Sequence, residues 1–387
     1  MKTFHCICGQ LIFFENISCV NCHRELGFLP NCLTLTSLDP AEKCLWRPTM
    51  KDAQESLYKK CLNYEKEKVC NWMVPQQEED AEFCVSCRLN EIIPDLSIEA
   101  NRNLWARVED AKRRLVYTLI RLRLPLENKV LNPQQGLAFR FLGDQTNPDG
   151  SISKVLTGHD QGVITLNIAE ADDATREKMR NAMKEPYRTL QGHFRHEIGH
   201  YYWDRLVAGS NFLESYRQLF GEERSDYNQA LAKYYQTGAP ANWQEKHISA
   251  YSTAHPWEDW AETWAHFLHM QDVLETANDF GLVGKQLLPD SKTGQKPQPD
   301  VTPAAKSNNV LLKDWSNCGN WENSLEISNF DGVIVAWSQL AIALNSINRS
   351  MGLPDLYPFV LSPAVIGKMR FVYEVVSQPA PASATHS

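Results

Sequence analysis

The chain has 387 residues, of which 43% are hydrophobic, 10% aromatic and 22% charged. This is the composition of a globular protein, and the length predicts two or three domains, which excludes a largely disordered chain. The formal net charge of -8 argues against a general nucleic-acid-binding protein, because such proteins are usually basic.

No signal peptide is expected, because the first ten residues, MKTFHCICGQ, lack an apolar segment. The longest apolar stretch, roughly residues 333–347, is interrupted by polar side chains and is expected to be too short and too polar to span a bilayer. In a reducing compartment, cysteine pairs at short spacing are more often zinc ligands than disulfides, which fits the 11 cysteines of this chain. We therefore expect a soluble, cytoplasmic protein with no membrane partner.

Residues 1–30 are predicted to form a zinc ribbon. Two close cysteine pairs lie there, separated by a short β-prone stretch: Cys6, Cys8, Cys19 and Cys22. Each pair is expected on a turn, and the two turns would close over one tetrahedral ion that supplies much of the folding energy of so small a domain. The Cys6–Cys8 spacing is tighter than the usual pair, so His5 or His23 could replace one thiolate. Free cysteines in a small core are the alternative.

Residues 31–98 are predicted to hold a second structural zinc. The signal is weaker, because this set combines one close pair with two dispersed cysteines: Cys61, Cys70, Cys84 and Cys87. Cys32 and Cys44 could substitute as ligands but are expected to be buried thiols. Cys318 stands alone and is expected to be structural.

Residues 99–376 are predicted to form an α+β catalytic domain. Apolar residues at spacings of three and four predict a helix over residues 101–123, which Pro125 ends. Alternating segments at 137–143 and 162–171 predict strands, with a turn at the NPDG sequence after the first. A helix is expected over 173–185, and Pro186 suits the first turn of the next helix. Strands followed by helices favour an α+β domain over a βαβ repeat.

Residues 196–200 read His-Glu-Ile-Gly-His, an H-E-x-x-H motif in a segment that can be helical. On a helix, His196 and His200 share one face and can present both imidazoles to one zinc ion. Glu197 lies close enough to hold a water on that ion. The sequence does not continue as a metzincin, because Trp203 and Leu206 stand where that class has glycine and histidine.

A third ligand is predicted in the segment 255–266. Pro256 suits a helix start, and Glu258 and Glu262 lie four residues apart on one helical face. The first carboxylate could ligate zinc, and the second could accept the free N–H of a ligand histidine. Asp259 is a poorer candidate, because it is rotated by about 100° from Glu258.

The C-terminal part is predicted to be helical after a linker. Residues 284–310 are rich in Pro, Lys, Ser and Asn and are expected to form a mobile loop. Helices are expected over 331–351 and 362–376, the second with Ser362 as its cap and Pro363 as its first residue. The tail, residues 377–387, is expected to be disordered.

The H-E-x-x-H motif with the downstream E-x-x-x-E pair resembles the gluzincin pattern. It most resembles the lethal-factor-like branch, in which a tyrosine seven residues before the ligand glutamate faces the active site, as Tyr251 precedes Glu258 here. Over most of residues 1–375 the chain resembles a bacterial family of zinc-binding metallopeptidases with an N-terminal zinc ribbon. The resemblance implies a zincin-like peptidase domain that hydrolyses peptide bonds.

The resemblance also implies roles for individual residues. His196, His200 and Glu258 would bind the catalytic zinc, and Glu262 would bond one ligand histidine. Glu197 would be the general base and later carry the proton to the leaving amine. The phenol of Tyr251 would donate to the carbonyl oxygen as it gains charge. The cofactors are then one catalytic and one or two structural zinc ions, and the partner is a protein or peptide substrate, which strand 162–171 could bind along its edge.

Other interpretations stay open. The motif could be a degenerate site in a zinc-ribbon adaptor, although Glu197 is intact, and a protease acting on DNA-bound proteins would need more basic residues at 1–30. His193, His266 and His269 are expected to pack or be solvated rather than ligate. The tryptophans at 257, 260 and 264 recur at helical spacing and are expected in the core.

Overall fold

The computed structural model describes residues 2–53, 55–147, 149–183, 189–282, 330–357 and 360–378. It divides into two compact units, one containing the chain up to Ser210 and the other beginning at Asn211. Two earlier predictions lie outside the described residues: the loop at 284–310 and the role of Cys318. The same holds for the tail beyond residue 378 and for Pro186.

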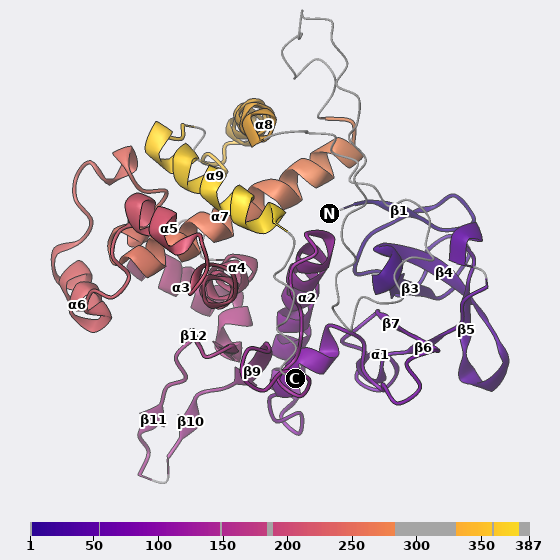
Figure 1. Cartoon of the computed structure of the whole chain (residues 1–387). Coiled ribbons are helices and arrows are strands. Elements are labelled where there is room, and N and C mark those ends of the chain that lie inside the picture. The colour runs from indigo at the N-terminus through magenta and orange to yellow at the C-terminus, as the bar shows by residue number, and fades with distance from the viewer. Residues whose placement is uncertain are drawn as a thin grey trace, which may run out of the picture. The chain divides into compact units, whose positions relative to one another are not determined.

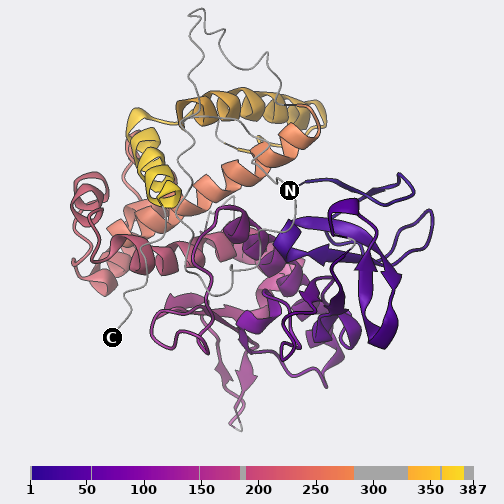
Figure 2. The same cartoon turned by 45° about the vertical axis from the view of Figure 1, so that its right-hand side comes forward.

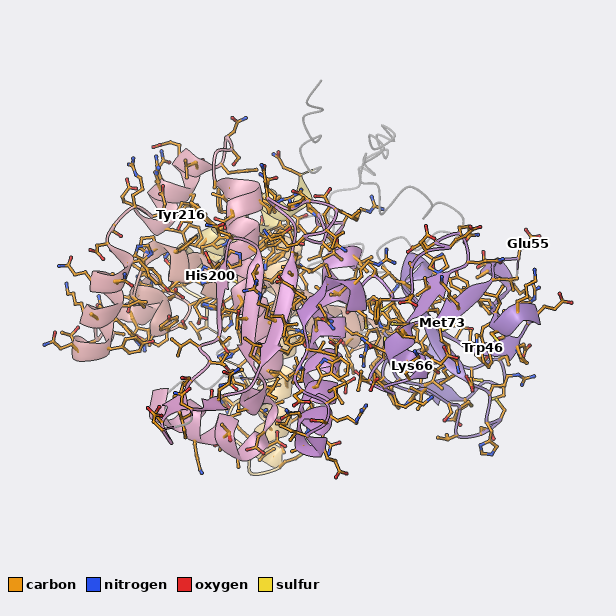
Figure 3. All side chains as sticks on the ribbon, turned by 90° about the horizontal axis from the view of Figure 1, so that it is seen from below. Trp46, Glu55, Lys66, Met73, His200 and Tyr216 are labelled. Carbon is orange, nitrogen blue, oxygen red and sulfur yellow. The ribbon has the colours of Figure 1, made fainter. Side chains whose placement is uncertain are left out.

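The first unit begins with small antiparallel sheets. Strands β1 (Phe4–His5) and β2 (Leu11–Ile12) form a hairpin. A five-stranded antiparallel meander follows, in the order β3 (Leu26–Leu29), β4 (Thr34–Pro40), β5 (Trp46–Pro48), β6 (Tyr58–Lys60) and β7 (Met73–Pro75) (Figure 1). Trp46 of β5 and Met73 of β7 are labelled in Figure 3. The short helix α1 (Leu62–Glu65) connects β6 to β7.

Helix α2 (Glu99–Arg121) joins this cysteine-rich part to the following sheet within the same unit. The ring of Tyr117 lies edge-on to Phe14 and Phe28, with centroids 5.6 and 6.0 Å away. Arg113 donates to the carbonyl oxygen of Val69. The helix was predicted over 101–123, and its apolar face is buried as expected, with Leu115 among its fully buried residues.

The second sheet of this unit is four-stranded, with the order β12 (Gly158–Asp160), β13 (Val163–Asn167), β9 (Ala138–Leu142) and β8 (Asn90–Ile92). β13 and β8 run parallel to β9, and β12 is antiparallel to β13. Strands β10 (Gln145–Thr146) and β11 (Ile152–Ser153) form a separate antiparallel hairpin that projects from the sheet (Figure 1).

The expectation that the strand predicted at 162–171 offers a free edge is wrong. β13 is paired on both sides, and β12 takes the edge. The reason is the two-residue turn at Gln161 and Gly162, whose φ angles are 46° and 84°. Positive φ at both positions is the geometry of a type I′ turn, which folds the three residues before it back as a strand.

Helices α3 (Asp173–Met183) and α4 (Leu190–Tyr202) complete the described helices of the first unit. Pro186 is predicted from the sequence to lie in the first turn of this helix, but α4 begins at Leu190. The hydroxyl of Thr189 caps it there by accepting from Gly192 N at 2.9 Å. It ends in a π-helical turn, Trp203–Val207. Its apolar face packs on the sheet through Phe194, whose ring is 5.7 Å from that of Phe139.

The described helices of the second unit are α5 (Leu213–Phe220), α6 (Tyr227–Thr237), α7 (Pro256–Asp279), α8 (Phe330–Ser350) and α9 (Pro363–Ser377). α7 is in contact with α5, α8 and α9 (Figure 2). Tyr216 of α5 is labelled in Figure 3. Two predicted starts are confirmed: Pro256 opens α7, and Ser362 caps α9 by accepting from Val365 N.

Helix α8 corrects the expectation about the apolar stretch at 333–347. The helix has 21 residues and a mean hydropathy of 1.4 over its most apolar window, so by length and composition alone it is long and apolar enough to cross a membrane. Ser338 and Ser346 donate to carbonyl oxygens one turn earlier, which lowers the free-energy cost of placing their hydroxyl groups in an apolar environment. A core helix passes the same test, and α8 contacts α7 and α9.

Candidate metal centres

The first group of cysteines comes together from two turns: Cys6 and Cys8 lie between β1 and β2, and Cys19 and Cys22 lie between β2 and β3. The sulfurs of Cys6 and Cys22 are 3.4 Å apart and those of Cys8 and Cys19 are 3.6 Å apart. Thiolates at 2.3 Å from one zinc would be about 3.8 Å apart at tetrahedral angles, so the four donors fit this ion. In the part of the chain that the structure describes, neither His5 nor His23 replaces a cysteine in this group.

The turns that carry these cysteines explain the tight spacing. Cys6 N donates to Gln10 O and Gly9 N to Cys6 O, and Gly9 has a φ of 85°. The glycine therefore supplies the left-handed residue that lets the chain reverse directly after Cys8.

The second group lies in the core of the same unit. The sulfur of Cys70 is 3.8 Å from that of Cys84 and 3.7 Å from that of Cys87, and Cys61 completes the set. All four cysteines are buried. Burial alone would lower the pKa of Arg113 on α2, but the charge of Cys70 beside it raises that pKa above its usual value. A zinc ion held by four thiolates would leave a net negative charge there, which the Arg113 guanidinium would offset.

The expectation that Cys32 and Cys44 are buried thiols is wrong for both. Cys32 is buried but disulfide-bonded. Cys44 is a free, exposed thiol in the turn between β4 and β5, at a φ of 59°. A disulfide is uncommon in a reducing compartment. The cytoplasmic placement stays a prediction.

Helix α4 brings His196 and His200 together as the motif predicts. Their Nε2 atoms are 3.2 Å apart. Two imidazoles at about 2.0–2.1 Å from one zinc would have nitrogens about 3.3–3.4 Å apart at tetrahedral angles, so the pair fits one ion. His200 is buried (labelled in Figure 3), whereas His196 and Glu197 are half-buried. The helix thus packs Phe194 on the central part of the sheet, whereas His200 lies beside the edge strand β12.

Two residues beside His200 were missed from the sequence. His159, on the edge strand β12, stacks on His200 with ring centroids 6.4 Å apart. Its Nε2 accepts from Gly162 N at 2.9 Å, and burial lowers its pKa to about 3, so its ring is neutral. Asp204 lies one turn after His200, and burial raises its pKa to about 6. Neither His159 nor Asp204 belongs to a sequence motif, so the sequence did not indicate that they lie beside His200.

In the second unit, Glu258 lies in the first turn of α7 and is 1% exposed. The phenol of Tyr227 on α6 donates to Glu258 Oε1 at 2.6 Å. Tyr227 was also missed, because nothing in the sequence links the two positions. Burial raises the pKa of Tyr251 well above its usual value, and the charges of Glu258 and Glu262 add to this effect. The Tyr251 phenol therefore keeps its proton and can donate it in a hydrogen bond.

Asp259, the poorer ligand candidate, is paired with basic side chains of the second unit. It is 1% exposed and pairs with Lys368 of α9, with Oδ2 and Nζ 2.5 Å apart. His247 lies 3.3 Å from the same oxygen. Asp259 is thus committed to a buried ion pair within the second unit.

The other histidines and the tryptophans lie where packing predicts. His193 pairs with the buried Glu170, and His266 is buried against Tyr357. Trp260 and Trp264 are fully buried in α7, whereas Trp257 is half-buried.

Comparison with known proteins places the chain in a family. A family model described as "Putative zinc-binding metallo-peptidase" matches residues 101–375, and a zinc-ribbon domain model matches residues 3–98. The chain therefore belongs to this zinc-binding metallopeptidase family and carries an N-terminal zinc ribbon, and both models support zinc as its metal.

Similar proteins occur in mycobacteria. The chain is 41% identical over 384 residues to an uncharacterized protein of Mycobacterium tuberculosis and to one of Mycobacterium bovis. The match covers 98% of this chain and 97% of each relative. No solved structure matches the chain.

Proposed function

We propose that the protein is a zinc-dependent peptidase whose catalytic zinc is held by His196, His200 and Glu258. The observation that carries the proposal is the convergence of the two imidazole nitrogens on α4, 3.2 Å apart, in a chain of this family. Two histidines and one carboxylate leave a fourth position open, as in catalytic rather than structural zinc sites. Under this proposal, a carboxylate oxygen of Glu258 would complete the donor set that the two imidazoles begin.

The bound zinc would supply a Lewis acid that polarises the scissile carbonyl and lowers the pKa of a water. Glu197 follows His196 directly on α4 and takes the proton of the attacking water. The same carboxyl group then carries this proton to the amine that leaves. Tyr251 keeps its phenol protonated and donates to the carbonyl oxygen as it gains negative charge.

The substrate would be an extended peptide that pairs with β12. Among the described residues, this strand is the edge of the sheet beside α4, and its His159 stacks on His200. Backbone pairing at a sheet edge binds peptides with little dependence on their side chains. The neutral ring of His159 adds no positive charge next to the zinc ligand.

Two structural zinc ions are proposed in the cysteine groups, which gives three zinc ions per chain. We further propose a cytoplasmic enzyme that acts on protein or peptide substrates and does not bind nucleic acid. The acidic composition supports the last point.

Metal removal and reloading test the proposal. Dialysis against a chelator selective for the weakest zinc should abolish peptide cleavage, and one added equivalent of zinc should restore it. His200→Ala should stay inactive after reloading. Cleavage by metal-free protein would contradict the zinc mechanism, and no cleavage by any zinc-loaded form would favour a zinc-ribbon binding protein with a vestigial peptidase domain.

A further inference from the structure

The buried carboxylate of Glu258 receives a hydrogen bond from a helix that the sequence motifs do not include. Tyr227, the first residue of α6, donates its phenol to Oε1 at 2.6 Å. The two residues are 31 positions apart and belong to the same unit.

Local contacts fix the position of the Tyr227 phenol. Asp226 caps α6 by accepting from Gln229 N at 2.9 Å. The Tyr227 ring lies edge-on to His255 and Trp257, with centroids 5.2 and 6.2 Å away. His255 is itself held, because Nδ1 accepts from Trp257 N and Nε2 lies 2.9 Å from the Ser225 hydroxyl.

Packing of α6 alone does not explain this arrangement. None of the residues of α6 is buried, so the helix contributes little to the hydrophobic core. Its first residue nevertheless reaches a carboxylate that is 1% exposed. A buried carboxylate is costly without hydrogen-bond partners, and the phenol offsets part of that cost at Oε1.

We propose that Tyr227 is a positioning residue of the catalytic zinc site, a role that rests on the proposed function. Its hydrogen bond to Oε1 restricts the rotation of the Glu258 carboxylate and so fixes the orientation in which this group would meet the metal. A carboxylate that is engaged at one oxygen binds zinc through the other in one orientation. Hydrogen-bond partners of metal ligands typically change metal affinity 10- to 100-fold.

Zinc affinity of the full-length Tyr227→Phe variant tests the proposal. The substitution keeps the ring and its contacts with His255 and Trp257 and removes only the hydroxyl. Competition with a chromophoric chelator should show about 10- to 100-fold weaker binding of the catalytic zinc, with the cysteine-bound zinc unchanged. Tyr235→Phe is the matched control, because Tyr235 lies on the same helix and is 65% exposed. It should bind zinc as the wild type does.

Two comparisons separate the possible failures. Wild-type zinc affinity in Tyr227→Phe, beside weak affinity in Glu258→Ala, would overturn the role of Tyr227 and leave the ligand set intact. Wild-type affinity in Glu258→Ala would overturn the proposed site itself. Thermal unfolding of the zinc-free proteins provides the readout for a purely structural role. A lower melting temperature in Tyr227→Phe with unchanged zinc affinity would count against the proposal.

Discussion

Glu258 and Asp259 are neighbours in the first turn of α7, yet their surroundings give them different tasks. Glu258 is bonded by the phenol of Tyr227, and Asp259 is bonded by the ammonium group of Lys368. A cation beside Asp259 balances its charge within the protein, whereas the neutral phenol of Tyr227 does not balance the charge of Glu258, which a metal ion would do under our proposal. The rotation of about 100° between successive helical residues separates the two environments.

Substitution of each acid should therefore give opposite results. Glu258→Ala should lower the zinc content by one ion per chain and abolish turnover. Asp259→Ala should keep all zinc but lower the free energy of unfolding by about 3–5 kcal/mol, because the buried ammonium of Lys368 loses its counter-charge and keeps only the carbonyl oxygen of Lys246. Metal analysis and denaturant unfolding measure the two effects. Full zinc content in Glu258→Ala would show that another residue is the third ligand.

The candidate site could be predicted from the sequence only where its residues follow a helical spacing. His196 and His200 are one turn apart, so the motif alone implied that they meet, and the 3.2 Å separation of their nitrogens agrees. Tyr227 and His159 reach the site residues through tertiary packing. No regular spacing links them to the motif, and the sequence therefore gave no indication of either.

At the scale of elements, the caps decide where the functional helices begin. Thr189 caps α4 and Ser362 caps α9, each by accepting from the backbone N–H three residues later. Pro363 made the start of α9 predictable from the sequence, because proline suits the first turn of a helix. For α4, the proline at 186 led to a predicted start that precedes the observed cap at Thr189.

Removal of the α4 cap should destabilise the protein modestly. Thr189→Ala should lower the free energy of unfolding by about 1 kcal/mol, because it leaves Gly192 N–H without its acceptor. Ser362→Ala should cost a similar amount at the start of α9 and serves as the comparison. Only the first should also change zinc affinity, since α4 carries both histidines. Equal zinc affinity in the two variants would show that the start of α4 does not control the site.

The sheet shows what a local pattern cannot give. Alternation predicted the strands at β9 and β13, but not that β12 lies outside β13. β12 has only three residues, which is too short to show the alternation of apolar and polar residues that is typical of a strand. Its pairing depends on the turn at Gln161 and Gly162. The order of strands follows from long-range pairing, and so the free edge was assigned to the wrong strand.

At the scale of the molecule, the cysteine-rich part and the sheet of the peptidase domain share one helix. α2 contacts the former through Tyr117 and Arg113. It also binds the latter: Lys112 and Glu109 form a fully buried ion pair, and both bond Asn90 of β8. The zinc ribbon is thus part of the same compact unit as α4, the helix that carries His196 and His200.

Deletion of residues 1–98 should therefore damage the remaining chain. It would remove strand β8 and with it Asn90, the partner of Lys112 and Glu109. It would also expose the ring of Tyr117 and leave the Arg113 guanidinium without its partners in the cysteine-rich part, so we expect an insoluble or molten product. Size-exclusion chromatography and thermal unfolding measure this. A soluble, cooperatively unfolding fragment would show that the ribbon is an independent module.

The zinc content should be three ions per chain in unchelated protein. Two should resist mild chelation, because four-thiolate sites close around the metal, and one should leave more easily from an open site. Measurement of metal by mass spectrometry against protein concentration gives the ratio. A value of one would contradict the proposal that both cysteine groups bind zinc.

Cleavage of a diverse peptide library by zinc-replete wild type, beside Glu197→Gln, tests the proposed chemistry most directly. Glu197→Gln keeps the size of the side chain and should keep all zinc, but it cannot accept a proton, so turnover should fall about 100- to 10,000-fold. Cuts made by the wild type and absent with the variant would establish a peptidase with Glu197 as its base. Equal cutting by both proteins, at equal zinc content, would contradict it.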